Sequence, residues 1–241
     1  MNDKSQGFVL QSIRYGDTSL IVKIFTLENG LQTFMVKGVR GKTSKNRAAF
    51  FQPMTFLRFV QNNKAFKSGI GYIKDVELSY PYRTATTNIY KSAVLMYLSD
   101  LLAHTLIQQE RNETLYHFVF HSVEWLDLVE TGYANFPLYF TLELSRFLGF
   151  YPQANFKDRA LFDMMEGQFV MTPPIHPYYL DESNSRRLSC MLNLGINELV
   201  TVPMTRVQRN ALLDGIVTFM RLHAPVLKSL QSHEILKEVL R

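Results

Sequence analysis

Hydrophobic and polar residues alternate along most of the first 80 positions of the chain. Five segments rich in Val, Ile, Phe, Tyr and Thr show this period of two, which is typical of half-buried β-strands. Turn-forming residues separate the segments, and Asn29-Gly30 predicts a type I′ hairpin turn, which needs positive φ at both central residues. The five predicted strands lie within residues 7–16, 19–28, 31–39, 54–62 and 66–80.

After Pro81 the pattern changes to helical spacing, with apolar residues every three or four positions. Helices are expected at residues 89–108, 115–129 and 137–149, the last ending at Gly149, and near residues 183–194, 205–223 and 231–240. The prolines within residues 150–182 indicate an irregular insertion, with a hairpin around Glu166-Gly167.

These two patterns predict an α+β protein. Five strands within residues 1–80 match the number of strands and the length of an OB fold. This fold is a small barrel that commonly binds single-stranded nucleic acid. We therefore expect a five-stranded OB-fold barrel over residues 1–80, followed by a mainly α-helical domain over residues 81–241.

The positive charge is concentrated in the predicted barrel. Residues 1–80 hold 12 Lys and Arg against 5 Asp and Glu, whereas residues 81–241 hold 14 against 16, and residues 29–74 contain no acidic residue. Such a surface favours a polyanion, because each cation that neutralises a phosphate releases a condensed counterion. An incidentally basic surface is the alternative. The candidate nucleic-acid-binding residues are Arg14, Lys23, Lys37, Arg40, Lys42, Lys45, Arg47, Lys64 and Lys67.

Aromatic residues of the barrel are weaker candidates, although bases stack on aromatic side chains in OB folds. Alternation places Lys23 and Phe25 on one face of their strand, opposite Val22 and Ile24. We expect Phe25 in the barrel core, because a small barrel needs large interior side chains.

The chain lacks the motifs of phosphate-binding loops, dinucleotide folds, zinc peptidases and serine hydrolases. His117 and His121 have a spacing that two metal ligands on one helix would share, but their aromatic neighbours favour a partly buried helix face. Asp163 and Glu166 are expected to be solvated turn residues, and Cys190, the one cysteine, to be buried in a helix. We therefore expect no catalysis, no cofactor and no metal.

No apolar run approaches the ~18 residues that a membrane-spanning helix needs. The N-terminus also lacks the basic and then apolar order of a secretory signal. A soluble, cytoplasmic protein is expected.

Several segments, in the same order, resemble the RecO family of DNA repair proteins. G-F-V-L-Q-S-I-R-Y-G-D-T at residues 7–18 resembles the family's opening strand and turn, and F-M-V-K-G-V-R-G-K-T-S-K at 34–45 resembles its basic segment, with Phe51-Gln52-Pro53 after it. F-x-L-x-L-x-x-F-L-G-F at 140–150 resembles the family's helix ending in Leu-Gly-aromatic, and L-K-S-L-Q-S-H-E-I-L at 227–236 its C-terminal helix. The similarity spans nearly the whole chain.

The resemblance implies a recombination mediator without catalysis. Such a protein binds single- and double-stranded DNA, anneals complementary strands, contacts the acidic tail of the single-strand binding protein through its helical domain, and acts with RecR to load RecA. By resemblance, Arg14, Lys37, Arg40, Lys42 and Lys45 belong to the DNA site. Arg146 is the candidate for the tail.

One departure from the family is clear, because many members carry a four-cysteine zinc motif after the Leu-Gly-aromatic helix and this chain has no cysteine there. Two alternatives stay open for function. The barrel would serve as an RNA-binding OB module in one, and as a protein-binding scaffold in the other.

Overall fold

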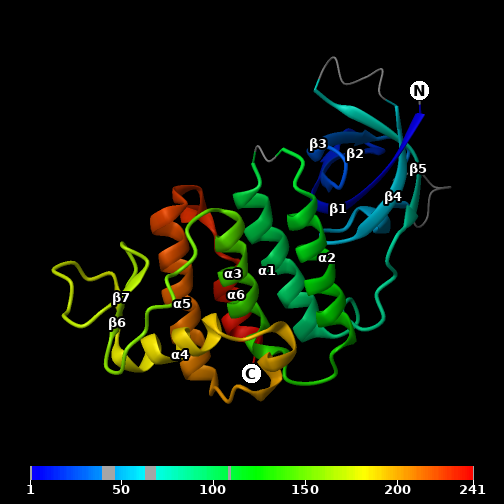
Figure 1. Cartoon of the computed structure of the whole chain (residues 1–241). Helices are drawn as coiled ribbons and strands as arrows, with labels where there is room; N and C mark the ends of the chain where they lie inside the picture. The colour runs from blue at the N-terminus through cyan, green and yellow to red at the C-terminus, as the bar shows by residue number, and fades with distance from the viewer. Residues whose placement is uncertain (1, 40–46, 63–68, 108–109, 241) are drawn as a thin grey trace. The chain divides into compact units, whose positions relative to one another are not determined.

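The structure is a computed structural model that describes residues 2–39, 47–62, 69–107 and 110–240 (Figure 1). The chain divides into two compact units, Met1–Asp127 and Leu128–Arg241. The first unit holds the barrel and two helices, and the second holds the remaining helices and a small sheet.

Five strands close into a barrel in the order β1-β2-β3-β5-β4 (Figure 1). The long β1 closes it, because its second half pairs with β2 and its first half with β4, and a short parallel contact joins β3 to β5. This arrangement confirms the predicted five-stranded OB-fold barrel ahead of a helical region. The strands are β1 (Asn2–Tyr15), β2 (Ser19–Thr26), β3 (Gly30–Val36), β4 (Phe56–Asn62) and β5 (Gly71–Leu78).

Two local predictions in the barrel were wrong. First, β1 begins at Asn2 rather than at residue 7, because its polar opening residues pair with β4 and need no apolar alternation of their own. Second, the turn at Asn29-Gly30 is not type I′, since Gly30 has positive φ (66°) and Asn29 does not. Residues 27–29 instead form a longer turn, in which the Asn29 N–H donates to the hydroxyl of Thr26 (3.1 Å).

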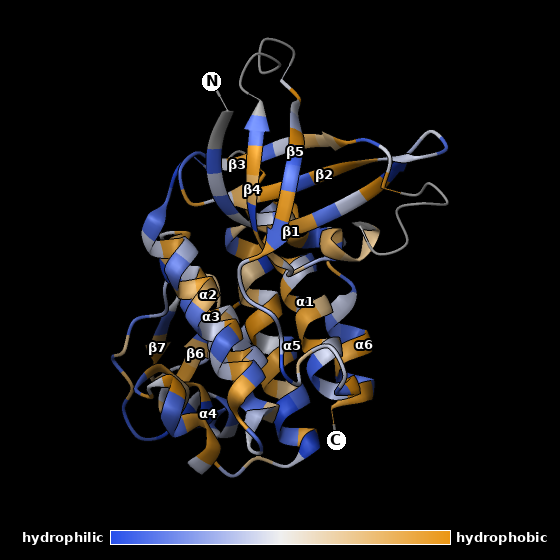
Figure 2. Cartoon of the chain, turned by 90° about the vertical axis from the view of Figure 1, so that its right-hand side faces the viewer, coloured by the Kyte–Doolittle hydropathy of each residue, from blue (hydrophilic) through white to orange (hydrophobic). Residues whose placement is uncertain are grey.

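Apolar side chains at alternate positions fill the barrel, as the period of two predicts. Val9, Ile24, Phe34 and Leu57 are fully buried within it, and Phe59 meets Phe34 edge to face with ring centroids 5.2 Å apart. Figure 2 shows that hydrophobic residues of β4 and β5 are interrupted by hydrophilic ones. Outward-facing residues that no helix covers, such as Tyr72 and Lys74 of β5, are exposed.

Gly7 lies where β1 leaves no room for a side chain. A Cβ atom at this position would lie 2.5 Å from Ile24 Cγ2 and 2.8 Å from the backbone oxygen of Phe25. Gly7→Ala should therefore lower the free energy of unfolding by about 1–3 kcal/mol, the usual cost of overpacking a core. Urea denaturation measures this loss. As a control, Gly195→Ala should change stability by less than ~0.5 kcal/mol, since its nearest contact is the flexible carboxylate of Glu198 at 3.4 Å, and equal effects of the two substitutions would contradict the argument.

Two helices complete the first unit, α1 (Ile89–Thr105) and α2 (Glu113–Leu128). Asn88 caps α1 by accepting hydrogen bonds from two backbone N–H groups, and Asn112 accepts one at the start of α2. Tyr116 of α2 packs on the outer surface of the barrel, 5.8 Å from the ring of Phe8 between centroids. Burial raises the pKa of Tyr116 to about 12, so its hydroxyl stays protonated at neutral pH.

The carboxylate of Asp127, at the end of α2, fixes the segment that connects the barrel to α1. It accepts hydrogen bonds from the backbone N–H groups of Arg83 (2.9 Å), Thr84 (2.8 Å) and Ala85 (2.7 Å). The hydroxyl of Tyr80 donates a fourth at 2.9 Å. Asp127 is fully buried, so its charge is stabilised by these donors rather than by water.

In the second unit, α5 (Arg206–His223) packs against α3 (Phe136–Phe147) and α4 (Glu182–Leu192). The predicted insertion forms a three-stranded sheet of β6 (Leu161–Asp163), β7 (Gln168–Val170) and β8 (Tyr179–Leu180), in the order β7-β6-β8. The predicted hairpin joins β6 to β7. The chain ends with α6 (Ser232–Val239). Within the described residues, no helix has the length and apolar character needed to cross a membrane.

Candidate nucleic-acid interface

One outward-facing row of apolar side chains crosses four strands of the barrel. Ile13 of β1 pairs with Ile21 of β2, which pairs with Met35 of β3, which pairs with Tyr72 of β5. We call these four residues the interface row. Ile13 is 49% exposed, and Tyr15, next on the same face of β1, is 53% exposed. Exposed apolar side chains that gather on one face of a barrel favour a binding site.

Cations flank the interface row. Lys23 follows Ile21 on the outer face of β2 and is exposed. The ammonium of Lys37 lies 5.0 Å from the ring centroid of Tyr72, which keeps both side chains at the surface. Lys74 is exposed nearby on β5, and a hollow of about 120 Å³ lies between Met35, Lys37, Tyr72 and Lys74. Aromatic and basic groups are therefore interleaved, as single-strand binding requires.

The structure places three of the predicted residues on the barrel surface. Lys23 and Lys37 flank the interface row, whereas Arg14 is exposed on the opposite face of β1, because it pairs with the core residue Leu20. Arg14 thus lies at the end of the barrel beside the turn at Gly16, not within the row.

The other predicted basic residues of the barrel cannot be placed. Arg40, Lys42, Lys45, Lys64 and Lys67 lie outside the described residues. The backbone of Arg47 begins a short 3-10 helix (Arg47–Phe51), but its side chain also lies outside the described part of the structure. Their roles stay predictions, from charge for all of them and also from the family resemblance for Arg40, Lys42 and Lys45.

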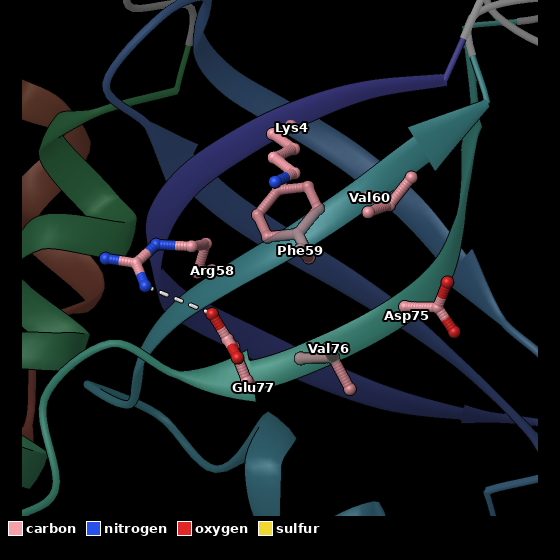
Figure 3. Close-up of a pocket in the computed structure, with 7 residues that line it drawn as sticks. All are labelled: Lys4, Arg58, Phe59, Val60, Asp75, Val76 and Glu77. Atoms are coloured by element: carbon pink, nitrogen blue, oxygen red, sulfur yellow. Dashed lines mark hydrogen bonds and ion pairs between the residues drawn. The ribbon is translucent and has the colours of Figure 1, made fainter.

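A second outward surface, over β1, β4 and β5, has mixed charge. It surrounds a pocket of about 250 Å³ in which Lys4 and Arg58 lie with Asp75 and Glu77 (Figure 3). Arg58 donates to Glu77 at 3.1 Å, so its charge is already paired. The carboxylates repel phosphate, which makes this surface a poorer site for a polyanion than the interface row.

Helix α2 covers a third part of the outer surface. Phe25 is fully buried and lies 5.5 Å from Phe8 between ring centroids, while Phe8 and Phe56 contact Tyr116. Phe25 does share the outward face of β2 with Lys23, as alternation predicts. It is buried as expected, but against Phe8 on the outer side and outside the cluster that fills the barrel, so its place in the barrel core was predicted wrongly.

Arg146 lies in the last turn of α3 and is exposed. Its guanidinium contacts the ring of Tyr151 at 3.6 Å from the centroid and donates to Glu143 at 3.1 Å. Hydrogen bonding to Glu143 raises the pKa of Arg146 above its ordinary value. An acidic ligand would therefore have to share this guanidinium with Glu143.

Three expectations about reactive side chains need correction. Cys190 is exposed, because α4 buries Ser185, Leu188 and Met191, and Cys190 lies off that face. Two further corrections concern the histidines of α2 and the acidic residues of the hairpin.

His117 and His121 are exposed rather than partly buried. Their rings stack with centroids 6.1 Å apart, and they approach Glu113 and Glu124, respectively, on the solvent side of α2. The aromatic neighbours misled the prediction, because the buried face of the helix is formed by residues such as Val119.

Asp163 is buried rather than solvated, because it accepts hydrogen bonds from the N–H groups of Met165 (2.9 Å) and Glu166 (3.2 Å) inside the hairpin turn. Glu166 is exposed, as expected.

Among the described residues, one cluster has the composition of a metal site that sequence inspection missed. Asp214, His233 and Glu234 bring their ligand atoms together on α5 and α6. However, the ammonium of Lys237 lies 2.6 Å from Asp214 and 2.8 Å from Glu234. The two carboxylates already share a cation, so the cluster is explained as a network that attaches α6 to α5.

Comparison with known proteins gives a consistent result along the chain. The family model described as "Recombination protein O N terminal" matches residues 1–82, and "Recombination protein O C terminal" matches residues 86–231. The DNA repair protein RecO of Phocaeicola vulgatus is 33% identical over 240 residues, covering 99% of both chains. That of Flavobacterium johnsoniae is 32% identical with the same coverage, and that of Christiangramia forsetii is 30% identical over 98% of each chain.

These matches confirm the resemblance drawn from the motifs, and the single cysteine means that the chain has no four-cysteine zinc motif. The chain belongs to the RecO family of DNA repair and recombination proteins.

Proposed function

We propose that the chain binds single- and double-stranded DNA, anneals complementary strands and, with RecR, helps to load RecA onto DNA coated with single-strand binding protein. The observation that carries the proposal is the interface row with Lys23 and Lys37 beside it. Its apolar residues offer stacking surfaces to bases of any sequence, and its cations follow the phosphate backbone. This is the surface of strands that OB folds commonly use for oligonucleotides.

The proposed mechanism of annealing is electrostatic. Two DNA strands repel one another, and a basic surface that binds both screens this repulsion and raises their local concentration. Base pairing itself then selects the partner strand, so the protein needs no base-specific contacts for annealing. Neighbouring strands lie about 4.8 Å apart, so the interface row spans about 14 Å and contacts only a few nucleotides. Further contacts with DNA fall to the predicted basic residues outside the row.

The helical unit is proposed to dock the partner proteins. Arg146 is the candidate for the acidic tail of the single-strand binding protein, since it is exposed and stacked on Tyr151. We infer no catalytic step and no cofactor, because screening and docking suffice for the proposed function. The cytoplasm, where chromosomal DNA is, is the proposed location.

The test is annealing of complementary oligonucleotides coated with single-strand binding protein, followed by fluorescence over a salt series. We expect the protein to accelerate annealing at low salt and to lose this effect steeply as salt rises. The underlying affinity for single strands should fall with a slope of log affinity against log salt of about −0.7 per phosphate contact. Non-complementary strands serve as the control. When the strands are coated with single-strand binding protein that lacks its acidic tail, the acceleration should be smaller. Strands without any coat should be annealed as before, because their annealing does not use the tail.

Two results would overturn the proposal. Tighter binding to RNA than to DNA of equal sequence would assign the barrel to RNA. No binding to either nucleic acid at low salt would indicate a protein-binding scaffold.

A further inference from the structure

A β-bulge interrupts the regular pairing of β1 beside the interface row. The pairing of β1 with β2 shifts between Val9 and Gln11, so Leu10 is an extra residue in β1. The backbone oxygen of Leu10 accepts a hydrogen bond from the hydroxyl of Ser99 on α1 (2.8 Å). Bulges are enriched next to functional sites, where they change the direction of side chains. A groove lies beside the bulge, lined by residues of β1 and α1.

We call this hollow the bulge groove. Its volume is about 340 Å³, which is within the range of ~300–1,000 Å³ for small-molecule sites. Leu10, Pro53, Ala103 and the exposed Met96 provide its apolar surface. A flat apolar ring of the size of a nucleobase matches such a hollow better than a phosphate, which needs donors and charge.

Besides Ser99, whose hydroxyl donates to Leu10, three polar residues line the bulge groove: Gln11, Asp100 and His104. His104 Nδ1 lies 2.8 Å from the backbone oxygen of Asp100 and 3.2 Å from its carboxylate. A neutral ring must therefore donate through Nδ1, which leaves Nε2 as an acceptor. Within the described residues, neither the Gln11 amide nor the second carboxylate oxygen of Asp100 has a hydrogen-bond partner.

The bulge groove is continuous with the proposed DNA surface. Gln11 pairs with Lys23, which pairs with Thr33, so these residues form a second cross-strand row beside the interface row. Directly paired residues have Cβ atoms about 5 Å apart. A nucleotide whose phosphate contacts Lys23 can therefore place its base at Gln11. The carboxylate of Asp100 repels phosphate, so it favours entry of the base rather than the backbone.

We propose that the bulge groove holds one unstacked base of a single strand and prefers bases with an exocyclic amino group. A carboxylate accepts a hydrogen bond from the amino group of cytosine, whereas thymine has an oxygen at the same position. The inference rests on the proposed function and adds to it a site with limited base preference. Apolar packing against Met96 and Leu10 does not distinguish cytosine from thymine, so the preference for cytosine arises at Asp100.

The test compares binding of oligo(dC) and oligo(dT) of equal length at pH 8, measured by fluorescence anisotropy. We expect the natural protein to bind oligo(dC) roughly fivefold more tightly, at the low end of what one specific base contact provides. Asp100→Asn should remove this preference, because the amide has only one oxygen acceptor and its NH₂ group suits the thymine oxygen equally well. Asp75→Asn, on the mixed-charge surface, makes the same change of charge and should keep the preference.

The outcomes separate the groove from the proposed function. Equal binding of both oligonucleotides by the natural protein, or an unchanged preference in Asp100→Asn, would overturn the groove as a base site while leaving DNA binding intact. Absence of binding to both oligonucleotides would overturn the proposed function itself. Thermal unfolding of the Asp100→Asn protein, expected to match that of the natural protein, shows that the variant is folded.

Discussion

Replacing Asp127 by alanine is expected to lower the free energy of unfolding by about 3–5 kcal/mol, because it removes a fully buried acceptor of four hydrogen bonds and leaves the buried N–H of Ala85 without a partner. The carboxylate accepts from the N–H groups of Arg83, Thr84 and Ala85 and from the hydroxyl of Tyr80. No other acceptor for these N–H groups occurs among the contacts of the described residues. Urea denaturation followed by circular dichroism measures the loss.

Two matched substitutions separate this network from a general effect of removing an acid. Asp127→Asn keeps the size and one oxygen acceptor, so it should cost less than Asp127→Ala. Asp75→Ala removes an exposed carboxylate from β5 of the same unit and should change stability by less than ~0.5 kcal/mol. A loss below about 1 kcal/mol in Asp127→Ala would show that water replaces the carboxylate and that the segment is not fixed by it.

The pH dependence of stability gives an independent check on Asp127. Burial acts to raise the pKa of this carboxyl, but the backbone hydrogen bonds and Tyr80 together lower it below its ordinary value of 3.8. A lowered pKa in the folded state means that the contribution to stability is present above pH 3.8 and is lost as the pH falls through the folded-state pKa. The stability difference between the natural protein and Asp127→Asn should therefore shrink below pH 3.8.

The barrel could be predicted from sequence because each of its strands has one buried face. The period of two identifies such strands, and the positive charge over residues 1–80 favours a polyanion as the ligand. The same reasoning does not predict what covers the outside of a strand. Phe25 is on the outward face that alternation predicts and is fully buried there, but the neighbouring rings Phe8 and Phe56 pack against Tyr116 and Phe120, which are distant in sequence.

The parts that sequence reasoning missed depend on long-range polar contacts. Nothing near Asp127 in the sequence indicates that its partners lie more than 40 residues earlier. The bulge at Leu10 is also invisible in the apolar pattern, since Phe8, Val9 and Leu10 are all buried, although only Val9 belongs to the barrel core. Tyr72 and Met35, in contrast, follow from strand alternation once the order of the strands is known.

Replacing both Lys23 and Lys37 by alanine is expected to weaken single-stranded DNA binding by about sixtyfold at ~50 mM salt. Each phosphate contact on a single strand contributes about −0.7 to the slope of log affinity against log salt, which amounts to roughly eightfold per contact at this concentration relative to 1 M. Both lysines are exposed beside the interface row, and Lys37 is held at Tyr72 by its contact with the ring. Fluorescence anisotropy over a salt series should also show the slope becoming shallower by about 1.4.

The matched control removes two cations from the other outward surface of the same barrel. Lys4 and Arg58 lie with Asp75 and Glu77 around the pocket of Figure 3, and Arg58 is already paired with Glu77. Replacing both by alanine changes the net charge equally but should alter affinity by less than about threefold, because paired and acid-flanked cations release few counterions when DNA binds. Equal losses in the two double variants would mean that DNA responds only to the total charge of the barrel. A loss confined to Lys23 and Lys37, with the shallower slope, would place the phosphate backbone along the interface row.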